Sequence, residues 1–451
     1  MSHRSKAYPL RPFTGRPWIG AILISLLMVA VACGSSGDEP GATREAGEDR
    51  ASGEGSAEET GNGGSEEEAP PEATTGAAED GGGAADTETA DTETVDPALA
   101  AELQAILDQS VADGQIPGAM LAVSTSDGQT WYGSSGLADR TTGAPMEPEE
   151  PYRIASITKT FTAVTVLQLV EEGRVDLNAP ITAYLPNLDV PNADQMTVRM
   201  LLDHTTGLYN YLQDPNFLAG VYDNPERVWQ PEELIAYNVS FPPDFAPPGA
   251  EWHYSSANYV ILGLLVEEVT GNSHAQEIRS RILEPLGMDR TFFPPDEELP
   301  ETLPTGYFNA EDHSDNSVSA AYATSNMVST NRDMQRFGQA LFEEDLLEAG
   351  TREQMFRFVP GNGEYDMPDL AYGLGVMSHQ HPVGPGPDGT PRPPDATTAY
   401  GHIGGFGGFR TALWHVPERD ITITVAVNQF VTDPNTIPTA ALDAVLTAQG
   451  E

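Results

Sequence analysis

Residues 34–96 contain almost no large apolar side chain, so we expect the folded part of the chain to lie in the residues after them. The segment consists almost entirely of Gly, Ala, Ser, Thr, Glu and Asp, and it carries 19 acidic side chains against two arginines. A chain of this composition cannot bury enough apolar surface to offset the entropy lost on folding. We therefore expect a disordered acidic linker over 34–96 and a folded domain over 97–451.

The first 33 residues have the pattern of a secretory signal. Four basic residues and no acidic ones precede an apolar stretch over 19–32, which is too short to span a bilayer comfortably. The stretch ends in small residues followed by Cys33, the single cysteine of the chain. One cysteine excludes an internal disulfide and a Cys-based zinc or iron–sulfur site.

The residues around Cys33 resemble the lipobox of bacterial lipoproteins, in which the cysteine is lipidated and becomes the mature N-terminus. Ala30 stands where leucine is commoner. The resemblance implies an extracytoplasmic protein that is anchored to the cell membrane, with 34–96 as a spacer. The alternatives are an ordinary signal peptide with an incidental cysteine, and a linker that serves only as a solubilising tail.

The charge balance argues against nucleic acid as a partner. The chain has 22 basic and 68 acidic side chains, a net charge of −46. Binding a phosphate backbone needs Lys and Arg to replace its counterions, and docking on anionic lipid needs a basic face. Neither the composition nor any motif indicates an oligomeric state.

Hydrophobic periodicity indicates terminal strands and a largely helical middle. The predicted helices are 97–112, 156–172, 258–270 and 438–449, and the predicted strands are 119–124, 130–133, 411–414 and 421–427. A Pro/Gly-rich loop is expected from Gly375 to about Pro394. Helices that flank a group of terminal strands, with helical segments between them, favour a mixed α/β fold with an inserted, mainly helical lobe.

The first chemical signal is Ser156, three residues before Lys159. On a helix this spacing puts the two side chains on one face. A serine hydroxyl is a weak nucleophile until a neighbour accepts its proton, which a buried amine with a lowered pKa can do. Lys159 is the single lysine after Lys6, and arginine could not serve as a base because it does not lose its proton. The alternative is a surface lysine on a helix.

The second signal is Tyr254, which is followed by Ser255 and Ser256. A phenol is a poor base by itself, since its pKa is about 10. Beside Lys159 its phenolate would be stabilised, so we expect Tyr254 to take the proton from Ser156 and pass it to the leaving group. The alternative is a tyrosine of the core.

The third signal is the run His402, Ile403, Gly404 and Gly405. Glycines beside a strand let a substrate lie close to the backbone. A free N–H at this place, together with that of Ser156, would form an oxyanion hole.

In this order the three motifs resemble the serine β-lactamase and penicillin-binding DD-peptidase superfamily, in its class C-like branch, over nearly all of 97–451. The resemblance implies a β-lactamase/transpeptidase-like fold, an antiparallel sheet flanked by helices with an inserted helical lobe. The catalytic residues that it implies are Ser156, Lys159, Tyr254 and His402, and those that contact the substrate or the oxyanion are Ser256, Gly404 and Gly405. It places His204 in a structural segment near the site.

Two positions depart from the family's pattern. Ser256 stands where asparagine is usual, and Ile403 stands where threonine is usual. Losing a polar partner of a charged group costs roughly 1.5–3 kcal/mol, which weakens the case for penicillins and D-Ala-D-Ala peptides with a free carboxylate. Arg410 is a candidate replacement charge, and an exposed arginine is the alternative.

The favoured hypothesis is an extracytoplasmic serine hydrolase that forms an acyl-enzyme at Ser156, of the esterase or amidase type. The alternatives are a penicillin-binding D-Ala-D-Ala carboxypeptidase or β-lactamase, and a non-catalytic cell-wall-binding lipoprotein. The expected partner is a small-molecule ester or amide, or a peptidoglycan-type substrate, with no cofactor. No metal is expected either, because His379 and His381 have no evident third ligand.

Overall fold

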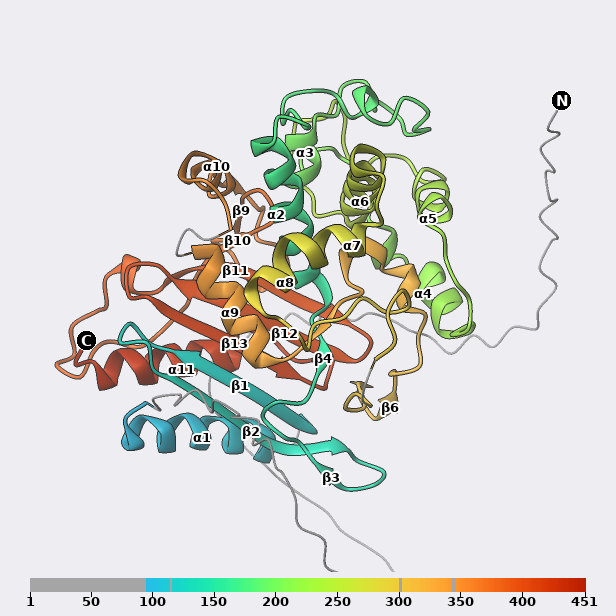
Figure 1. Cartoon of the computed structure of the whole chain (residues 1–451). Coiled ribbons are helices and arrows are strands. Elements are labelled where there is room, and N and C mark those ends of the chain that lie inside the picture. The colour runs from blue at the N-terminus through green and yellow to red at the C-terminus, as the bar shows by residue number, and fades with distance from the viewer. Residues whose placement is uncertain (1–94, 114–115, 300–301, 343–345) are drawn as a thin grey trace, which may run out of the picture. The chain divides into compact units, whose positions relative to one another are not determined.

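The computed structural model describes residues 95–113, 116–299, 302–342 and 346–451 (Figure 1). The predicted signal segment with Cys33, and the linker up to residue 94, lie outside the described residues. Within the described ranges, no helix combines the length and the apolar character needed to cross a membrane.

The centre of the fold is a nine-stranded sheet in which all neighbouring strands run antiparallel. In spatial order its strands are β3 (Ala144–Pro145), β2 (Thr130–Asp139), β1 (Gly118–Ser124), β13 (Ile421–Val427), β12 (Phe409–Val416), β11 (Thr398–Phe406), β10 (Met377–Gln380), β9 (Ala371–Tyr372) and β8 (Val359–Pro360). Strand β1 pairs directly with β13, so segments from opposite ends of the described chain meet at the middle of the sheet. Both are fully buried, as their apolar residues require.

Helices cover both faces of this sheet (Figure 1). Helices α1 (Pro97–Ala112) and α11 (Thr436–Ala448) pack together on one face, and α9 (Asn331–Phe342) packs on β1, β12 and β13. Neighbouring residues of β1 belong to different core clusters, Met120 with α9 and Leu121 with α1 and α11. This alternation is what a strand between two layers needs, because successive side chains point to opposite faces.

The chain between the first and last strands of the sheet builds a helical lobe that packs against the face with α9. Its helices are α2 (Thr158–Glu171), α3 (Val198–Leu202), α4 (Pro215–Tyr222), α5 (Pro231–Asn238), α6 (Ser256–Thr270), α7 (His274–Ile278), α8 (Glu284–Leu286) and α10 (Ala349–Met355). Two short strand pairs complete the fold, β4 (Tyr152–Arg153) with β7 (Val328–Ser329) and β5 (Tyr307–Phe308) with β6 (Glu311–Asp312).

The predicted elements are confirmed with shifts of up to two residues at their ends, except that the strand predicted over 130–133 is longer and runs to Asp139 as β2. Helix α1 begins where the Asp-Pro signal places it, with the Asp96 carboxylate accepting the backbone N–H of Ala98 at 2.8 Å. Helix α6 ends at Gly271, whose φ of 80° is the left-handed conformation that glycine supplies. The predicted loop from Gly375 is wrong in part, because residues 377–380 form β10, whose pairing with β11 local patterning did not reveal.

Candidate active site

Ser156 lies in a 3₁₀ turn, η1 (Ala155–Ile157), that leads into α2. The backbone is strained there, because Ala155 has a φ of 49°, a region that non-glycine residues rarely adopt. The turn is held against the sheet by Thr411, whose hydroxyl donates to the carbonyl of Ile154 at 3.0 Å. A Cβ on Gly404 would lie 2.5 Å from that carbonyl oxygen, so β11 can approach the turn because this residue is glycine.

Lys159 contacts Ser156 as the sequence spacing predicts. Its Nζ lies 3.2 Å from the Ser156 Oγ and 3.1 Å from the carbonyl oxygen of Thr324. The side chain rises from the first turn of α2 and is 0% exposed. Both contacts therefore form away from bulk water, where hydrogen bonds and charges have stronger effects.

Burial lowers the pKa of Lys159 well below its ordinary value of 10.5. The cause is desolvation of the ammonium form, and no carboxylate among the described residues offsets it. An uncharged amine beside a serine hydroxyl can accept its proton, so the geometry makes Lys159 a candidate general base.

Tyr254 lies just before α6 with its ring over the same lysine. The Lys159 Nζ is 5.0 Å from the ring centre, and Tyr254 is 4% exposed. Its hydroxyl is buried and has no hydrogen-bond partner among the described residues. Burial raises the pKa of Tyr254, and the nearby Ser156 hydroxyl opposes part of that rise.

These two pKa directions favour a different proton path from the one that the sequence suggested. A phenolate at Tyr254 requires a charged ammonium beside it, whereas burial favours the neutral forms of both Tyr254 and Lys159. The neutral amine is then the group able to take a proton, and the neutral phenol is the group able to give one.

His402 lies behind the site rather than in it. Its Nε2 accepts from the hydroxyl of Tyr372 at 2.9 Å, and its Nδ1 donates to the carbonyl of Ile403 at 2.5 Å. Burial, with a smaller effect of the Lys159 charge, lowers the pKa of His402 to about 3. Both ring nitrogens are occupied and no hydrogen bond joins His402 to Ser156, so the imidazole is placed to support β11.

His204 supports the start of α6, in line with its expected structural role. Its Nδ1 accepts the backbone N–H of Ser255 at 3.2 Å and lies 3.0 Å from the Asn258 Nδ2. Its ring packs against Tyr254, with 4.3 Å between the ring centres. Burial lowers the pKa of His204 well below its ordinary value, so the ring is neutral there.

Ser156 opens into a cavity of about 250 Å³ between the helical lobe and β11. The lining residues that carry polar side chains or form the β11 wall are Ser156, Asn210, Gln213, Tyr222, Tyr254, Ser256, Ser325, Tyr365, Ile403, Gly404, Gly405, Phe406 and Arg410. The structure thus gathers five of the predicted site residues at one surface, with Lys159 directly beneath and His402 behind.

Two of the cavity residues that the sequence did not reveal form hydrogen bonds with predicted site residues. The Ser325 Oγ lies 3.2 Å from the Ser156 Oγ, and Asn210 accepts the backbone N–H of Ser256 at 3.1 Å through its Oδ1. Asn210 lies six residues after His204, which the sequence already placed near the site, and this proximity was a usable signal. Nothing local marks Ser325, which is brought in from 169 residues away.

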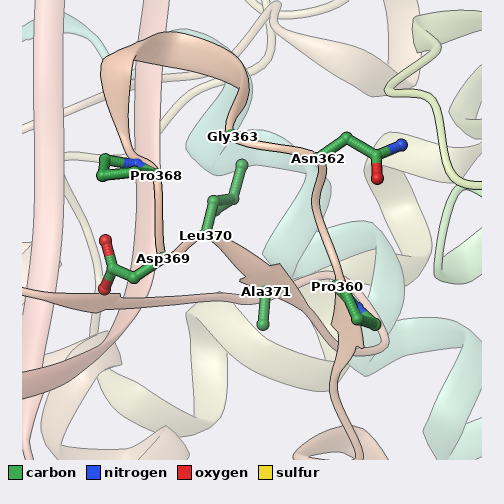
Figure 2. A pocket seen from close by; sticks show the side chains of 7 residues that line it. All are labelled: Pro360, Asn362, Gly363, Pro368, Asp369, Leu370 and Ala371. Carbon is green, nitrogen blue, oxygen red and sulfur yellow. The ribbon is translucent and has the colours of Figure 1, made fainter.

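A larger depression of about 720 Å³ lies at the sheet edge, beside β8 and β9 (Figure 2). Its lining includes Asn362, Asp369 and Leu370 but no serine, lysine or tyrosine. Size alone would favour this depression, but it lacks a nucleophile with an adjacent base. Within the described ranges there is also no group of three or more His, Cys, Asp or Glu residues that could hold a metal ion.

Comparisons with known proteins agree with this site. Esterase EstB of Burkholderia gladioli is 35% identical over 201 residues, which cover 42% of this chain and half of the esterase. A D-stereospecific amidohydrolase from Streptomyces sp. is 32% identical, with a TM-score of 0.66 over 76% of this chain and 98% of that one. The D-amino acid amidase from Ochrobactrum anthropi SV3 is 28% identical, with a TM-score of 0.69 over 78% of this chain and 99% of that one.

The similarity extends over most of the described domain. Residues 103–447 match the family described as Beta-lactamase, a range that contains every predicted site residue except Cys33. The antiparallel sheet with helices on both faces and an inserted helical lobe is the fold that the sequence motifs implied. The chain belongs to the beta-lactamase family.

Proposed function

We propose that the chain is a serine hydrolase that forms and hydrolyses an acyl-enzyme at Ser156, acting on esters or amides. The observation that carries the proposal is the 3.2 Å contact between the Ser156 Oγ and the Lys159 Nζ, with the lysine fully buried. A buried amine without a carboxylate partner is an unfavourable choice for stability alone. Its position beside an alcohol at a cavity wall gives it a chemical use.

The geometry supports a route for acylation. The Lys159 amine takes the proton of Ser156 as the Oγ attacks the substrate carbonyl carbon. The neutral Tyr254 phenol gives its proton to the leaving alcohol or amine as the scissile bond breaks, and it is reprotonated by the Lys159 ammonium. In deacylation a water molecule attacks the acyl carbon from the side of the departed leaving group and passes a proton through Tyr254 to the Lys159 amine. The bond between the acyl carbon and the Ser156 Oγ then breaks, and the Lys159 ammonium returns the proton to the Oγ.

The cavity wall supplies groups for the developing oxyanion. Ser156 and Gly405 both line the cavity, and their backbone N–H groups are the proposed donors, worth about 10²–10³-fold in kcat for each donor. Asn210 lines the same wall, and its Oδ1 is occupied by Ser256. In the family's pattern an asparagine stands at the position of Ser256. We expect the Asn210 amide nitrogen to donate to the substrate in place of that asparagine.

We favour an esterase or amidase over a penicillin-binding enzyme because the cavity has Ile403 where the family's pattern has a threonine hydroxyl. Ile403 lines the wall at 5% exposure, where the family's threonine would contact a substrate carboxylate. Esterase EstB, the D-stereospecific amidohydrolase and the D-amino acid amidase are among the similar proteins, and their names describe ester or amide hydrolysis.

Covalent labelling tests the proposal. Purified protein is incubated with a fluorescent fluorophosphonate and, separately, with a fluorescent penicillin, and the adducts are resolved on gels. We expect labelling by the fluorophosphonate and little by the penicillin, because a penicillin carries a carboxylate that meets Ile403 instead of a hydroxyl.

The other outcomes discriminate between functions. Strong labelling by both reagents would instead identify a penicillin-binding enzyme of the D-Ala-D-Ala carboxypeptidase or β-lactamase type. Labelling by neither, in protein with a cooperative melting transition, would leave a non-catalytic binding protein and refute the hydrolase.

We further propose that the protein is a lipoprotein held outside the cytoplasmic membrane through Cys33. A diacylglycerol with an N-acyl chain exceeds the weak anchoring of one acyl chain. Cys33→Ser should therefore move the protein from the detergent phase to the aqueous phase in detergent partitioning of cells expressing it. Ser36→Ala is the matched control and should partition as the parent does; equal partitioning of Cys33→Ser and the parent would refute the anchor.

A further inference from the structure

Arg410 is the one charged residue among the described residues that line the Ser156 cavity. It lies on β12 opposite Gly405 of β11, and its Nη1 is 2.7 Å from where a Cβ on Gly405 would stand. The guanidinium therefore reaches across the strand pair to the backbone proposed to hold the oxyanion. The sequence leaves open whether Arg410 is exposed; the structure shows it partly buried at the cavity wall.

Neighbouring groups hold the Nε and the guanidinium plane of Arg410, but they leave its two terminal nitrogens without a hydrogen-bond partner among the described residues. Its Nε donates to the carbonyl of Phe430 at 2.7 Å, and its guanidinium carbon lies 4.3 Å from the Phe430 ring centre. No carboxylate among the described residues forms an ion pair with it, although Asp433 and Tyr365 are near enough to oppose the effect of burial, which lowers its pKa. Its two terminal nitrogens have no hydrogen-bond partner within the described part of the chain.

Among the residues that the structure describes, none that lines the cavity carries a charge of the opposite sign. Neither an aspartate nor a glutamate lines it, so a substrate ammonium group, such as the free amine of an amino acid amide, would find no carboxylate there. A partly desolvated, unpaired guanidinium is unfavourable until an anion occupies it, and its fork of N–H donors matches a carboxylate.

The position of Arg410 beside β11 indicates which half of a bound substrate, the acyl half or the leaving group, lies next to its guanidinium. Tyr254, the proposed proton donor to the leaving group, lies near His402, with 6.1 Å between the ring centres. The Cα of Gly405 is three residues further along the strand, about 10 Å from the Cα of His402 at 3.3 Å per residue. Arg410 pairs with Gly405, so it lies opposite the end of β11 that is away from His402 and Tyr254, and it is also beyond Ile403, where the family's pattern would bind a carboxylate.

We propose that the substrate carries a carboxylate in its acyl half, as in a half-ester or half-amide of a dicarboxylic acid, and that Arg410 binds this carboxylate. The proposal rests on the hydrolase function proposed above and names its substrate class. It separates this chain from hydrolases of uncharged acyl groups and of α-amino acid amides.

The test compares two esters with the same leaving group. Mono-4-nitrophenyl glutarate has a carboxylate at the end of its acyl chain, and 4-nitrophenyl pentanoate has a methyl group there. The ratio of their kcat/KM values is measured at about 0.15 M salt, where the Debye length is about 8 Å and repulsion by the net charge of −46 is largely screened. Arg410→Gln should lower the ratio by about 10-fold or more, the loss expected for a charge-assisted hydrogen-bonded pair.

Two further variants control for charge and folding. Arg410→Lys keeps the charge and should retain part of the preference, because a lysine binds a carboxylate without the bidentate geometry. Arg357→Gln removes the same charge from a side chain that is 63% exposed and outside the cavity, and should leave the ratio unchanged. An Arg410→Gln protein with a parental melting temperature and an unchanged ratio would overturn the proposal.

A binding measurement keeps the inference distinct from the hydrolase proposal. In the Ser156→Ala background, calorimetry compares the monoanilide of glutaric acid with pentananilide. Tighter binding of the anionic anilide that is lost on adding Arg410→Gln supports the carboxylate site even if the parent hydrolyses neither ester. Equal binding of the two anilides, with or without Arg410, refutes the site whatever the fate of the hydrolase proposal.

Discussion

Ser156→Ala should lower kcat for any ester or amide that the parent hydrolyses by at least about 10⁴-fold, and should abolish labelling by a fluorophosphonate. Removing the nucleophile leaves only substrate positioning and the oxyanion donors, which provide a small part of the acceleration in serine hydrolases. The measurement is steady-state kinetics together with mass spectrometry of the labelled peptide.

Ser325→Ala is the matched control for this prediction. The Ser325 Oγ lies 3.2 Å from the Ser156 Oγ, but Lys159 contacts Ser156 and the carbonyl of Thr324 instead. The label should therefore stay on the Ser156 peptide in Ser325→Ala. A label that moves with Ser325, or full turnover in Ser156→Ala, would show that the nucleophile has been assigned to the wrong serine.

Lys159→Arg should reduce kcat/KM by about 10³-fold or more, although it preserves the positive charge. Arginine holds its proton throughout the accessible pH range, so it cannot accept the proton of Ser156. In the parent, kcat/KM should rise with pH as Lys159 loses its proton, with a midpoint well below 10.5. Near-normal turnover by Lys159→Arg would exclude proton transfer through this side chain.

Lys159→Met should separate catalysis from stability. Turnover is lost, but the free energy of unfolding should depend less steeply on pH than in the parent. Because the pKa of Lys159 is lowered in the folded state, the unfolded state binds one more proton between that pKa and about 10.4. The parent is therefore destabilised as pH falls through this window, by about 1.4 kcal/mol per pH unit, and methionine has no such dependence.

Denaturant unfolding of both proteins at several pH values measures this difference. All other titrating groups are shared, so the change in the stability difference with pH reports Lys159 alone. The methionine leaves the Thr324 carbonyl without its partner, so the slope of the difference is the diagnostic quantity rather than its value at one pH. Parallel pH profiles would show that Lys159 keeps an ordinary pKa.

Local pattern was sufficient for much of this architecture. The Asp-Pro start of α1, the glycine that ends α6 and the apolar runs of β12 and β13 are each signalled within a few residues, and each is found in the structure. Strand β10 was missed because a short strand in a Pro/Gly-rich stretch is stabilised by pairing with β11, which local periodicity does not show.

The site divides in a similar way. Ser156 and Lys159 are three residues apart, so helical geometry alone predicts their contact, and the structure gives 3.2 Å. Ser325 and Arg410 reach the cavity through tertiary packing and strand pairing, and no local motif places them. Whether His402 can take part in catalysis also depends on packing. Its two ring nitrogens form hydrogen bonds with the Tyr372 hydroxyl and the Ile403 carbonyl.

Sequence by itself determined which chemical groups are present and which neighbours along the chain must meet: a single lysine after Lys6, a serine three residues before it, and an acidic segment with almost no large apolar side chains. Tertiary structure alone decided which of these groups are buried, and therefore in which direction their pKa values shift. Burial removes water from Lys159 and Tyr254 and leaves Arg410 facing a cavity without an acid. Desolvation depends on what surrounds a side chain in three dimensions, so it sets the protonation states, and with them the direction of proton transfer, only once the chain has folded.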